Sequence, residues 1–382
     1  MTKKVWSVVW MVSRSEFISI NPEVNREVFN LGGKSLLECY QCGSCTAVCP
    51  LSEELDVSFR RAIRYTQLGV EDKILGDISP WSCNLHGDCT DSCPRGASPS
   101  EILASIRRYQ SIKYDWTGIT KWWNYSSFAS KFLAYLAIFG LSLLLYFGLY
   151  WQSILEYAST GKLVVLSKLL IPVAVVFVIS FAILASNGYR AYKFMSRDKK
   201  KEVGLMESLK LISRFFLKLE TEAMGVPHKR DRILEHVLIL VGIGLFILLG
   251  IIYLIYPKFF DYEIISRALI YTASLTLLIG VSSPLTKRLL SSEKTHWYYK
   301  RFTHSVDWMS LITLFPIALM ALLVFILYDL SMVLYAYIAF ALLLSFLIPF
   351  LLLEFAFGKH THWLYKVIAY YVGARTGSFR GE

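Results

Sequence analysis

The stretch CYQCGSCTAVCP, residues 39–50, decides the fold of the N-terminal part of the chain. Its four cysteines are separated by two, two and three residues, and the last of them precedes a proline. Three thiolates at this spacing wrap a short loop around one face of an inorganic cubane, while the fourth, which the proline turns away, points at a second cluster. The spacing therefore predicts cysteine ligands for iron–sulfur clusters.

A second run, CNLHGDCTDSCP at residues 83–94, repeats this register with His86 in the place of the second cysteine. The pattern is typical of bacterial two-cluster ferredoxins, in which the fourth cysteine of each run ligates the other cluster. Interleaving predicts two [4Fe–4S] clusters. One is held by Cys39, Cys42, Cys45 and Cys93, and the other by Cys83, Cys89 and Cys49, with His86 as the candidate fourth ligand.

Two alternatives accompany this cysteine pattern. Four thiolates also suit tetrahedral zinc, although structural zinc usually uses paired C-x2-C knuckles rather than a triple spacing that ends in Cys-Pro. His86 either ligates its cluster and raises the reduction potential, as histidine ligation does in Rieske centres, or leaves three thiolates and a labile or three-iron cluster. All seven cysteines lie between Cys39 and Cys93, which favours metal ligation in a reducing compartment over disulfides.

The rest of the chain has the composition of a membrane protein. Of 382 residues, 55% are hydrophobic and only 18% are charged, and the long apolar runs lie after Phe132. A bilayer core of about 30 Å requires about 20 apolar residues per helix. Six stretches qualify as transmembrane helices: 132–151, 163–185, 237–256, 268–285, 309–328 and 331–353.

The distribution of basic residues predicts the orientation. If the N-terminal domain is cytoplasmic, then residues 187–232, 286–303 and the tail from Gly358 face the cytoplasm and together contain 21 Lys and Arg. The opposite loops contain few, among them Lys162 and Lys258. The positive-inside rule then predicts a multi-pass protein of the plasma (inner) membrane with its N-terminal domain and C-terminus in the cytoplasm. It also accounts for the net charge of +11, so we do not expect nucleic-acid binding.

The first of these basic loops contains an amphipathic pattern. Apolar residues fall on one helical face between residues 205 and 219, which fits a helix lying along the membrane interface. A helix that packs on the soluble domain fits equally well.

Histidines gather at one membrane face. His236 opens the predicted third helix and His362 follows the sixth, so antiparallel helices bring both to the cytoplasmic boundary. Two imidazoles from facing helices are suited to hold a b-type haem. The alternative is that these are ordinary interfacial side chains. His228, His296, His304 and His360 lie on the same side as rival ligands or as solvated loop residues.

The predicted fold is thus an N-terminal α-helical two-cluster ferredoxin domain followed by an all-α bundle of six transmembrane helices. We divide the chain into an iron–sulfur domain (1–118), two helices with a basic loop (119–232) and a four-helix cytochrome b-like domain (233–382). The motifs and loops contain neither a nucleophile with its base nor a Gly-rich nucleotide fingerprint. A subunit of this kind relays electrons.

At the cysteine runs, the chain resembles the C subunit of heterodisulfide reductase. Over nearly its whole length it resembles the membrane subunit of the quinone-interacting membrane-bound oxidoreductase (Qmo) family, which joins such a domain to a cytochrome b of the nitrate reductase gamma type. The matching residues in the soluble part are Gly32, Gly33, Cys39-Tyr-Gln-Cys42, Trp81, Cys83, Gly87-Asp88-Cys89 and Cys93-Pro94-Arg95-Gly96-Ala97, and those in the membrane part are His236, Gly244-Leu245-Phe246-Ile247, Asp307, Trp308, Lys359, His362, Tyr365 and Lys366.

This resemblance implies a subunit of a quinone-interacting oxidoreductase complex. It implies one haem b, bound by His236 and His362, and electron exchange with menaquinone. It further implies two partner subunits that carry flavin and iron–sulfur groups, and electron transfer toward adenylylsulfate reductase in sulfate respiration. Glu235, Asp307 and Glu354 flank the expected haem face as candidate proton carriers, because ionisable groups at membrane depth tend to be functional.

The chain departs from the family at two places. His86 replaces a family cysteine, and residues 339–345 lack a histidine that the family carries in its sixth helix, which puts a distal haem in doubt. Two further functions remain open. The chain is either a heterodisulfide-reductase-like subunit that serves a thiol substrate through a catalytic partner, or a membrane anchor that docks a ferredoxin domain without a redox role of its own.

Overall fold

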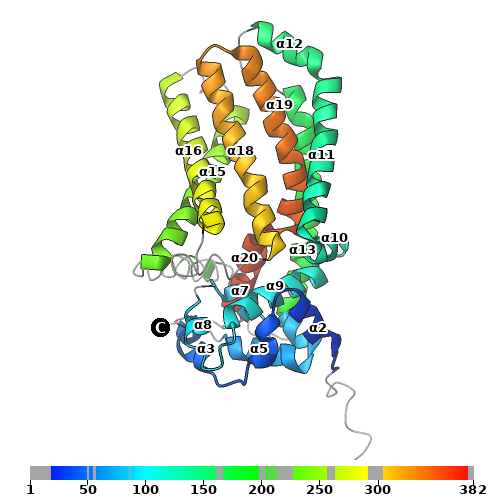
Figure 1. Ribbon diagram of the computed structural model, residues 1–382, viewed down its shortest axis with the longest axis vertical. Coiled ribbons are helices and arrows are strands. Elements are labelled where there is room, and N and C mark those ends of the chain that lie inside the picture. The colour runs from blue at the N-terminus through cyan, green and yellow to red at the C-terminus, as the bar shows by residue number, and fades with distance from the viewer. Residues whose placement is uncertain are drawn as a thin grey trace, which may run out of the picture. The chain divides into compact units, whose positions relative to one another are not determined.

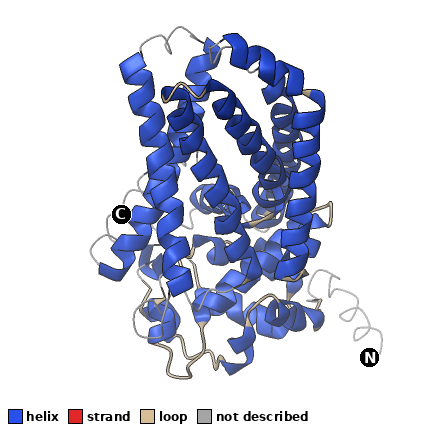
Figure 2. Cartoon of the chain, turned by 45° about the horizontal axis from the view of Figure 1, so that its top comes forward, coloured by secondary structure: helices blue, strands red, loops and turns tan. Residues whose placement is uncertain are grey.

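The structure is a computed structural model in which every described regular element is a helix (Figures 1 and 2). It describes residues 19–49, 51–54, 57–85, 87–160, 167–197, 204, 206–207, 210, 213, 227–255, 263–290 and 304–376. The amphipathic stretch predicted between residues 205 and 219 therefore lies largely outside the described residues. The chain divides into two compact units, one formed by residues 1–113, 191–203 and 372–382, and the other by 114–190 and 204–371.

The first unit contains short helices around a small apolar core. Its elements are α2 (Glu23–Asn30), η2 (Lys34–Glu38), α3 (Ser44–Ala47), α4 (Leu51–Glu54), α5 (Phe59–Leu68), α6 (Glu71–Gly76), α7 (Ser79–Ser82), α8 (Asp88–Asp91) and α9 (Pro99–Tyr114). Val24 and Val28 from α2, Ile63 from α5 and Ile102 and Ile106 from α9 are fully buried. Burying these faces together stabilises helices that are too short to persist alone.

Local signals fix both ends of α5, the central helix of this unit. The side chain of Ser58 accepts a hydrogen bond from the backbone N–H of Arg61 (3.2 Å), which caps the N-terminus. Gly69 ends the helix with a φ of 67°, a left-handed conformation that glycine adopts at no steric cost. A Cβ at this position would also collide with the backbone oxygen of Asn21. The helix is therefore tied to the chain entering α2.

The second unit contains the long apolar helices. Its elements are α10 (Ile119–Tyr125), α11 (Phe128–Leu149), α12 (Trp151–Thr160), α13 (Ser167–Ser196), α15 (Pro227–Ile255), α16 (Glu263–Leu290), α18 (Ser305–Asp329), α19 (Val333–Pro349), the π-helix η4 (Phe350–Phe355), the 3-10 turn η5 (Lys359–Thr361) and α20 (His362–Arg375). Residues at the ends of α13 and α20 belong to the first unit.

Six of these helices are long and apolar enough to cross a membrane, which confirms the predicted number. The segments are Phe128–Leu149, Leu169–Ser196, Ile233–Ile252, Ile264–Leu290, Ser305–Asp329 and Val333–Phe355. The prediction was wrong in one detail, since α15 begins at Pro227 and His236 lies inside the helix instead of opening it. The first turns of this helix are charged, so a search for apolar segments does not include them. They are compatible with a helix that extends beyond the bilayer.

Small residues and a few polar side chains pack the helices of the second unit. A Cβ at Gly242 would lie 2.7 Å from the Cβ of Leu277, so α15 and α16 approach as closely as only glycine permits. The hydroxyl of Tyr135 donates to the carbonyl of Phe346 (2.9 Å), and Ser142 donates to that of Ser345 (3.0 Å), which joins α11 to α19.

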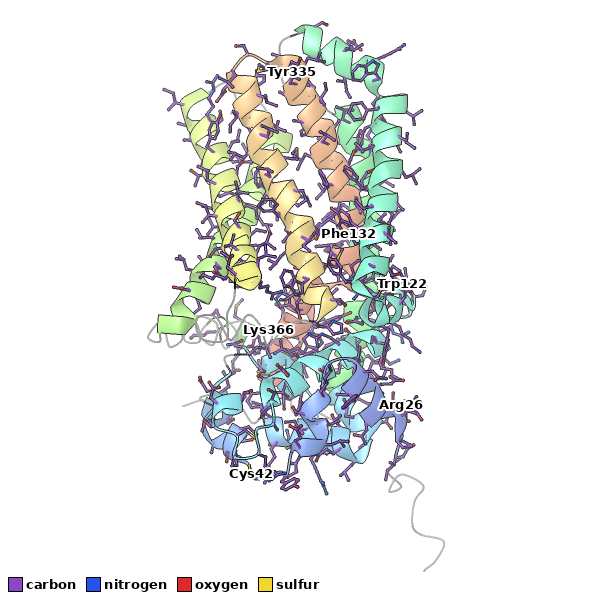
Figure 3. The ribbon with its side chains drawn as sticks, viewed as in Figure 1. Arg26, Cys42, Trp122, Phe132, Tyr335 and Lys366 are labelled. Atoms are coloured by element: carbon purple, nitrogen blue, oxygen red, sulfur yellow. The ribbon has the colours of Figure 1, made fainter. Side chains whose placement is uncertain are left out.

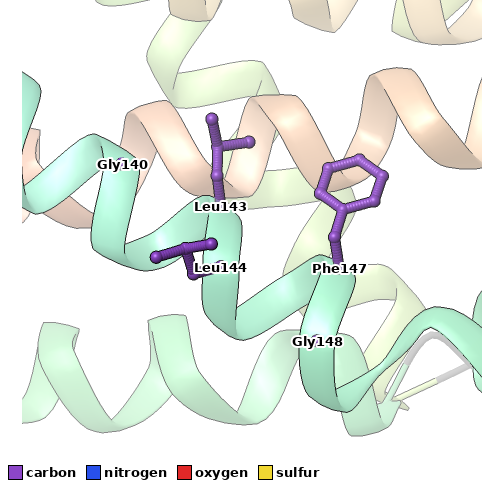
Figure 4. Close-up of a pocket in the computed structure, with 5 residues that line it drawn as sticks. All are labelled: Gly140, Leu143, Leu144, Phe147 and Gly148. Atoms are coloured by element: carbon purple, nitrogen blue, oxygen red, sulfur yellow. The ribbon is translucent and has the colours of Figure 1, made fainter.

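On its other side, α11 carries an apolar recess lined by Gly140, Leu143, Leu144, Phe147 and Gly148 (Figure 4). The two glycines leave room between the larger side chains. Leu144 is 72% exposed in the chain, as expected of a helix surface whose solvent is lipid.

Candidate metal centres

The two cysteine loops have the same backbone conformation. Gln41 and Leu85, at equivalent positions, both have a positive φ (61° and 55°), which is uncommon for residues other than glycine. Gly43 and Gly87 follow with φ of 91° and 96°, and each begins a four-residue helix, α3 or α8. The internal repeat seen in the sequence is therefore also a repeat of structure, with the cysteines held on matching loops.

The cysteine thiols fall into two neighbourhoods. The charges of Cys93 and Cys42 act on the thiol of Cys39, and those of Cys39 and Cys42 act on Cys45. Cys83 is close enough to act on Cys49, and Cys83 and Cys49 act on Cys89. Cys45 of the first group also lies near Cys89, so the two neighbourhoods adjoin there. Cys49 from the first run thus lies near the second run, and Cys93 from the second run lies near the first.

Burial varies among the thiols, since Cys45 and Cys83 are buried and the others are half-buried or exposed. Burial, reinforced by the charge of Cys83, raises the pKa of Cys49 to about 11 and that of Cys89 to about 12. Cys42 is exposed, and its hydrogen bond with the hydroxyl of Ser44 (3.5 Å) lowers the pKa of its thiol. Figure 3 labels Cys42 at the edge of its unit. Because thiolates are the metal ligands, the inner thiols require the positive charge of a bound metal to lose their protons.

Each loop is held by side chains that the cysteine pattern does not indicate. Gln67 of α5 donates from Nε2 to the carbonyls of Leu36 (2.9 Å) and Cys39 (2.8 Å). Arg107 of α9 donates from Nε to the carbonyl of Pro80 (2.6 Å) and from a terminal nitrogen to that of Cys83. Both residues were missed at the level of sequence because they act through backbone carbonyls, for which no motif exists.

Backbone hydrogen bonds reach cysteine sulfurs in both loops. Among the described residues, no three side chains of His, Cys, Asp or Glu lie close enough together to hold a metal ion. The backbone N–H of Leu85 donates to the sulfur of Cys83 (3.3 Å), and that of Gln41 bonds the sulfur of Cys39 in the same way. Hydrogen bonds to sulfur tune iron–sulfur centres. His86 lies outside the described residues, so its role stays a prediction.

In the second unit, the structure brings His236 and His362 together. Their ring centroids lie 6.5 Å apart with the planes inclined at 46°. Nδ1 of His362 donates to the backbone carbonyl of Lys359 (2.7 Å), because a carbonyl can only accept. This fixes the tautomer and leaves Nε2 as the nitrogen with a lone pair, an arrangement typical of metal-ligating histidines.

The rival histidines have other contacts. Nδ1 of His304 accepts from the backbone N–H of Val306 (3.4 Å) and caps α18. His360 lies 3.1 Å from the hydroxyl of Ser310 and packs its ring edge-on to Phe350, and burial lowers its pKa to about 4. His296 lies outside the described residues, as does the side chain of His228.

Comparison with known proteins supports the interpretation of the cysteine loops. Residues 35–97 match the family model of the 4Fe-4S dicluster domain. The chain is 32% identical over 114 residues to a protein of Archaeoglobus profundus that is like the C subunit of heterodisulfide reductase, covering 29% of this chain and 58% of that protein. It is 35% identical over 89 residues to the C subunit of the H(2):CoB-CoM heterodisulfide,ferredoxin reductase of Methanothermobacter thermautotrophicus. This match covers 23% of this chain and 48% of that protein.

A third relative is the C subunit of the ferredoxin:CoB-CoM heterodisulfide reductase of Methanosarcina mazei, 32% identical over 82 residues, which are 22% of this chain and 50% of that protein. The chain spans about half the length of the curated relatives that it matches. These relatives are subunits of redox complexes with several subunits. The chain therefore combines a 4Fe-4S domain like that of the heterodisulfide reductase C subunits with six helices suited to span a membrane.

Proposed function

We propose that this chain is the membrane subunit of a quinone-interacting oxidoreductase complex. It exchanges electrons between menaquinone and soluble partners through one haem b and two [4Fe–4S] clusters. The observation that carries the proposal is the pairing of His236 and His362 at 6.5 Å, with the tautomer of His362 fixed, in a chain that also has a dicluster domain.

The two neighbourhoods of thiols support the assignment of cluster ligands. Cys39, Cys42, Cys45 and Cys93 hold one cluster, and Cys49, Cys83 and Cys89 hold the other, with His86 as the fourth ligand. Because Cys42 is exposed, the first cluster is the one from which electrons pass to a soluble partner.

The spacing of the two imidazoles fits a bound haem iron. A metal held by two imidazole nitrogens at about 2.0 Å each lies between rings whose centres are about 6 Å apart. The distance of 6.5 Å between the two ring centroids agrees with this value. Haem b would supply one-electron chemistry when bound, and the two histidines that would hold it, with their hydrogen bonds, would tune its potential. Lys359 contributes by orienting His362 through its backbone carbonyl.

The identity of the partners rests on resemblance. Flavin and iron–sulfur subunits of the same complex would exchange electrons with the soluble domain, and adenylylsulfate reductase would accept them in sulfate respiration. The predicted orientation places the N-terminal domain and the C-terminus in the cytoplasm, where these partners would be.

Optical and EPR spectra of the purified full-length chain test this proposal. We expect a haem b band that menaquinol reduces, together with two cluster signals. His236→Ala and His362→Ala should each abolish the haem band and leave the cluster signals unchanged. A chain that shows cluster signals but never a haem band would support the membrane anchor instead.

A second function is favoured by the comparisons, because the relatives are heterodisulfide reductase subunits. In that case the chain would pass electrons to a partner that reduces a disulfide substrate. Isolation of the native complex separates the two functions, since a partner with thiol-disulfide chemistry should co-purify only in the second case.

A further inference from the structure

The structure separates three acidic residues that look alike in the sequence. Glu235 accepts hydrogen bonds from the ammonium of Lys287 and the hydroxyl of Ser283, both at 2.7 Å. Asp307 pairs with the ammonium of Lys359 at 3.0 Å. Glu354 is fully buried, at 0% exposure, and forms no ion pair with any residue that the structure describes. The ion pairs around Glu235 and Asp307 explain why those positions hold acids, but no ion pair explains the acid at Glu354.

Glu354 lies in the π-helix η4, which follows Pro349 at the end of α19. Its Oε2 accepts from the backbone N–H of Lys359 at 3.3 Å. Its Oε1 has no hydrogen-bond partner among the described residues. Short π-helical segments are frequent at functional sites, and a buried oxygen without a partner is rare enough to require an explanation.

A single residue connects this carboxyl to the haem ligand. The N–H of Lys359 donates to Glu354, and the C=O of Lys359 accepts from Nδ1 of His362 (2.7 Å). Gly358 makes this possible, because a Cβ there would collide with Oε2 of Glu354 and approach its Cα to 2.8 Å. The carboxyl is therefore linked to the imidazole through the backbone of Lys359.

The charged and titratable groups around Glu354 come from three other elements. Lys131 and Tyr135 face it from α11, Asp307 from α18 and Lys359 from η5. These groups have partners elsewhere. The ammonium of Lys131 donates to the hydroxyl of Ser305, Lys359 pairs with Asp307, and Tyr135 donates to a backbone carbonyl of α19. None of these contacts satisfies Oε1.

We propose that Oε1 of Glu354 binds one proton whenever the group held by His236 and His362 gains one electron, and releases it on reoxidation. This inference rests on the proposed haem. If that group took one electron from a quinol or a reduced iron–sulfur cluster, one proton from the aqueous phase would form the O–H bond at Oε1, and reoxidation would return it. The added proton balances the added electron, so the summed charge of the reduced group and the Glu354 carboxyl does not change. The electron therefore meets no repulsion from a carboxylate.

Redox titration of the haem absorbance in the full-length chain, repeated from about pH 5 to 8, tests the proposal. In the natural protein, the midpoint potential should fall as pH rises, with a slope approaching about 59 mV per pH unit. Glu354→Gln keeps an oxygen for the N–H of Lys359 but cannot take up a proton, so its potential should not vary with pH. A Glu354→Gln variant with the slope of the natural protein would overturn the proposal.

Asp329→Asn is the matched control. Asp329 is an acid at the end of α18, where it accepts from Tyr271 (2.6 Å) and pairs with Arg267 (3.5 Å). Because its carboxylate is already engaged by these two partners, its replacement should leave the pH slope unchanged. Loss of the slope in this variant would also overturn the assignment to Glu354.

A second measurement needs no variant, in case Glu354→Gln fails to load haem. The reduced-minus-oxidised infrared spectrum of the natural protein should contain a carboxylic acid C=O band that shifts in D2O. Absence of this band, in protein that binds haem, would defeat the inference and leave the proposed function intact. Absence of haem itself would defeat the proposed function and the inference together.

Discussion

The two cysteine loops share a backbone conformation but differ in what surrounds them. Both contain an uncommon positive φ before a glycine that starts a short helix. The first loop is held by a neutral amide, Gln67, at Leu36 and Cys39, and by the guanidinium of Arg60 at Gln41 (3.3 Å), and it exposes Cys42. The second is held by a guanidinium, Arg107, beside the buried Cys83. Repetition of the loop supplies matching backbone geometry for the ligands, while the side chains that hold each loop differ.

The largest effect is expected from removing a ligand of each neighbourhood. Cys42→Ser and Cys89→Ser should each abolish one cluster and lower the iron content by about half. EPR spectra of the anaerobically prepared variants check this, since the two substitutions should remove different signals. If both remove the same signal, the division of the thiols into two groups is wrong.

Removing the supports of the two loops should have a smaller and unequal effect. Arg107→Ala leaves two buried carbonyls without a charged donor and should destabilise the soluble unit by about 3 kcal/mol, and Gln67→Ala by about 2 kcal/mol. Loss of cluster absorbance during denaturation of the full-length chain measures both. Arg64→Ala, at an exposed position on α5, is the control and should change stability little. Equal losses at Arg107 and Arg64 would contradict the support role.

The equivalent glycines should respond alike. Gly43→Ala and Gly87→Ala force a side chain into the left-handed region at φ near 90°, which should cost each loop about 1 to 2 kcal/mol. Around Gly43 the added methyl group meets only the side chain of Arg60 at 3.8 Å, so backbone strain alone sets this cost. The same denaturation assay measures it. A variant as stable as the natural protein would show that the loop has relaxed to another conformation.

The smallest effect concerns an ion pair that touches neither loop. Burial alone would raise the pKa of Glu71, but bonds from Lys113 (2.8 Å), Tyr109 (2.6 Å) and Asn21 (2.7 Å) lower it below its ordinary value. The lowered pKa means that the carboxylate stabilises the fold above about pH 4.3 and that this contribution is lost as pH falls through the folded-state pKa.

Glu71→Gln should therefore lower the free energy of unfolding at neutral pH by about 1 kcal/mol. It should also reduce the loss of stability that occurs as the pH becomes acidic. Denaturation midpoints of both proteins at neutral and acidic pH check this. An undiminished acid dependence in the variant would assign the effect to other groups.

Much of the fold could be predicted from the sequence because its signals are local. The cysteine spacing indicated the soluble domain, and apolar length indicated six spans. Their ends were less predictable, since α15 begins with polar turns at Pro227 and α13 continues to Ser196. Hydropathy measures what fits in lipid, whereas hydrogen bonding decides where a helix stops.

The candidate site was predictable only in its ligands. The pattern of histidines pointed to His236 and His362, and the structure brings their rings together. The sequence could not indicate Gln67 or Arg107, because they donate to backbone carbonyls of residues far away along the chain. Nor could the sequence separate Glu354 from Glu235 and Asp307, because a lysine ammonium pairs with the latter two carboxylates and not with Glu354.

Determination of iron, acid-labile sulfide and haem in the anaerobically purified full-length chain tests the central claim most directly. Two cubanes predict about eight non-haem iron atoms per chain with a matching amount of sulfide, or about one iron fewer if His86 is not a ligand. One haem b should accompany them. Stoichiometric zinc with negligible sulfide would contradict the account.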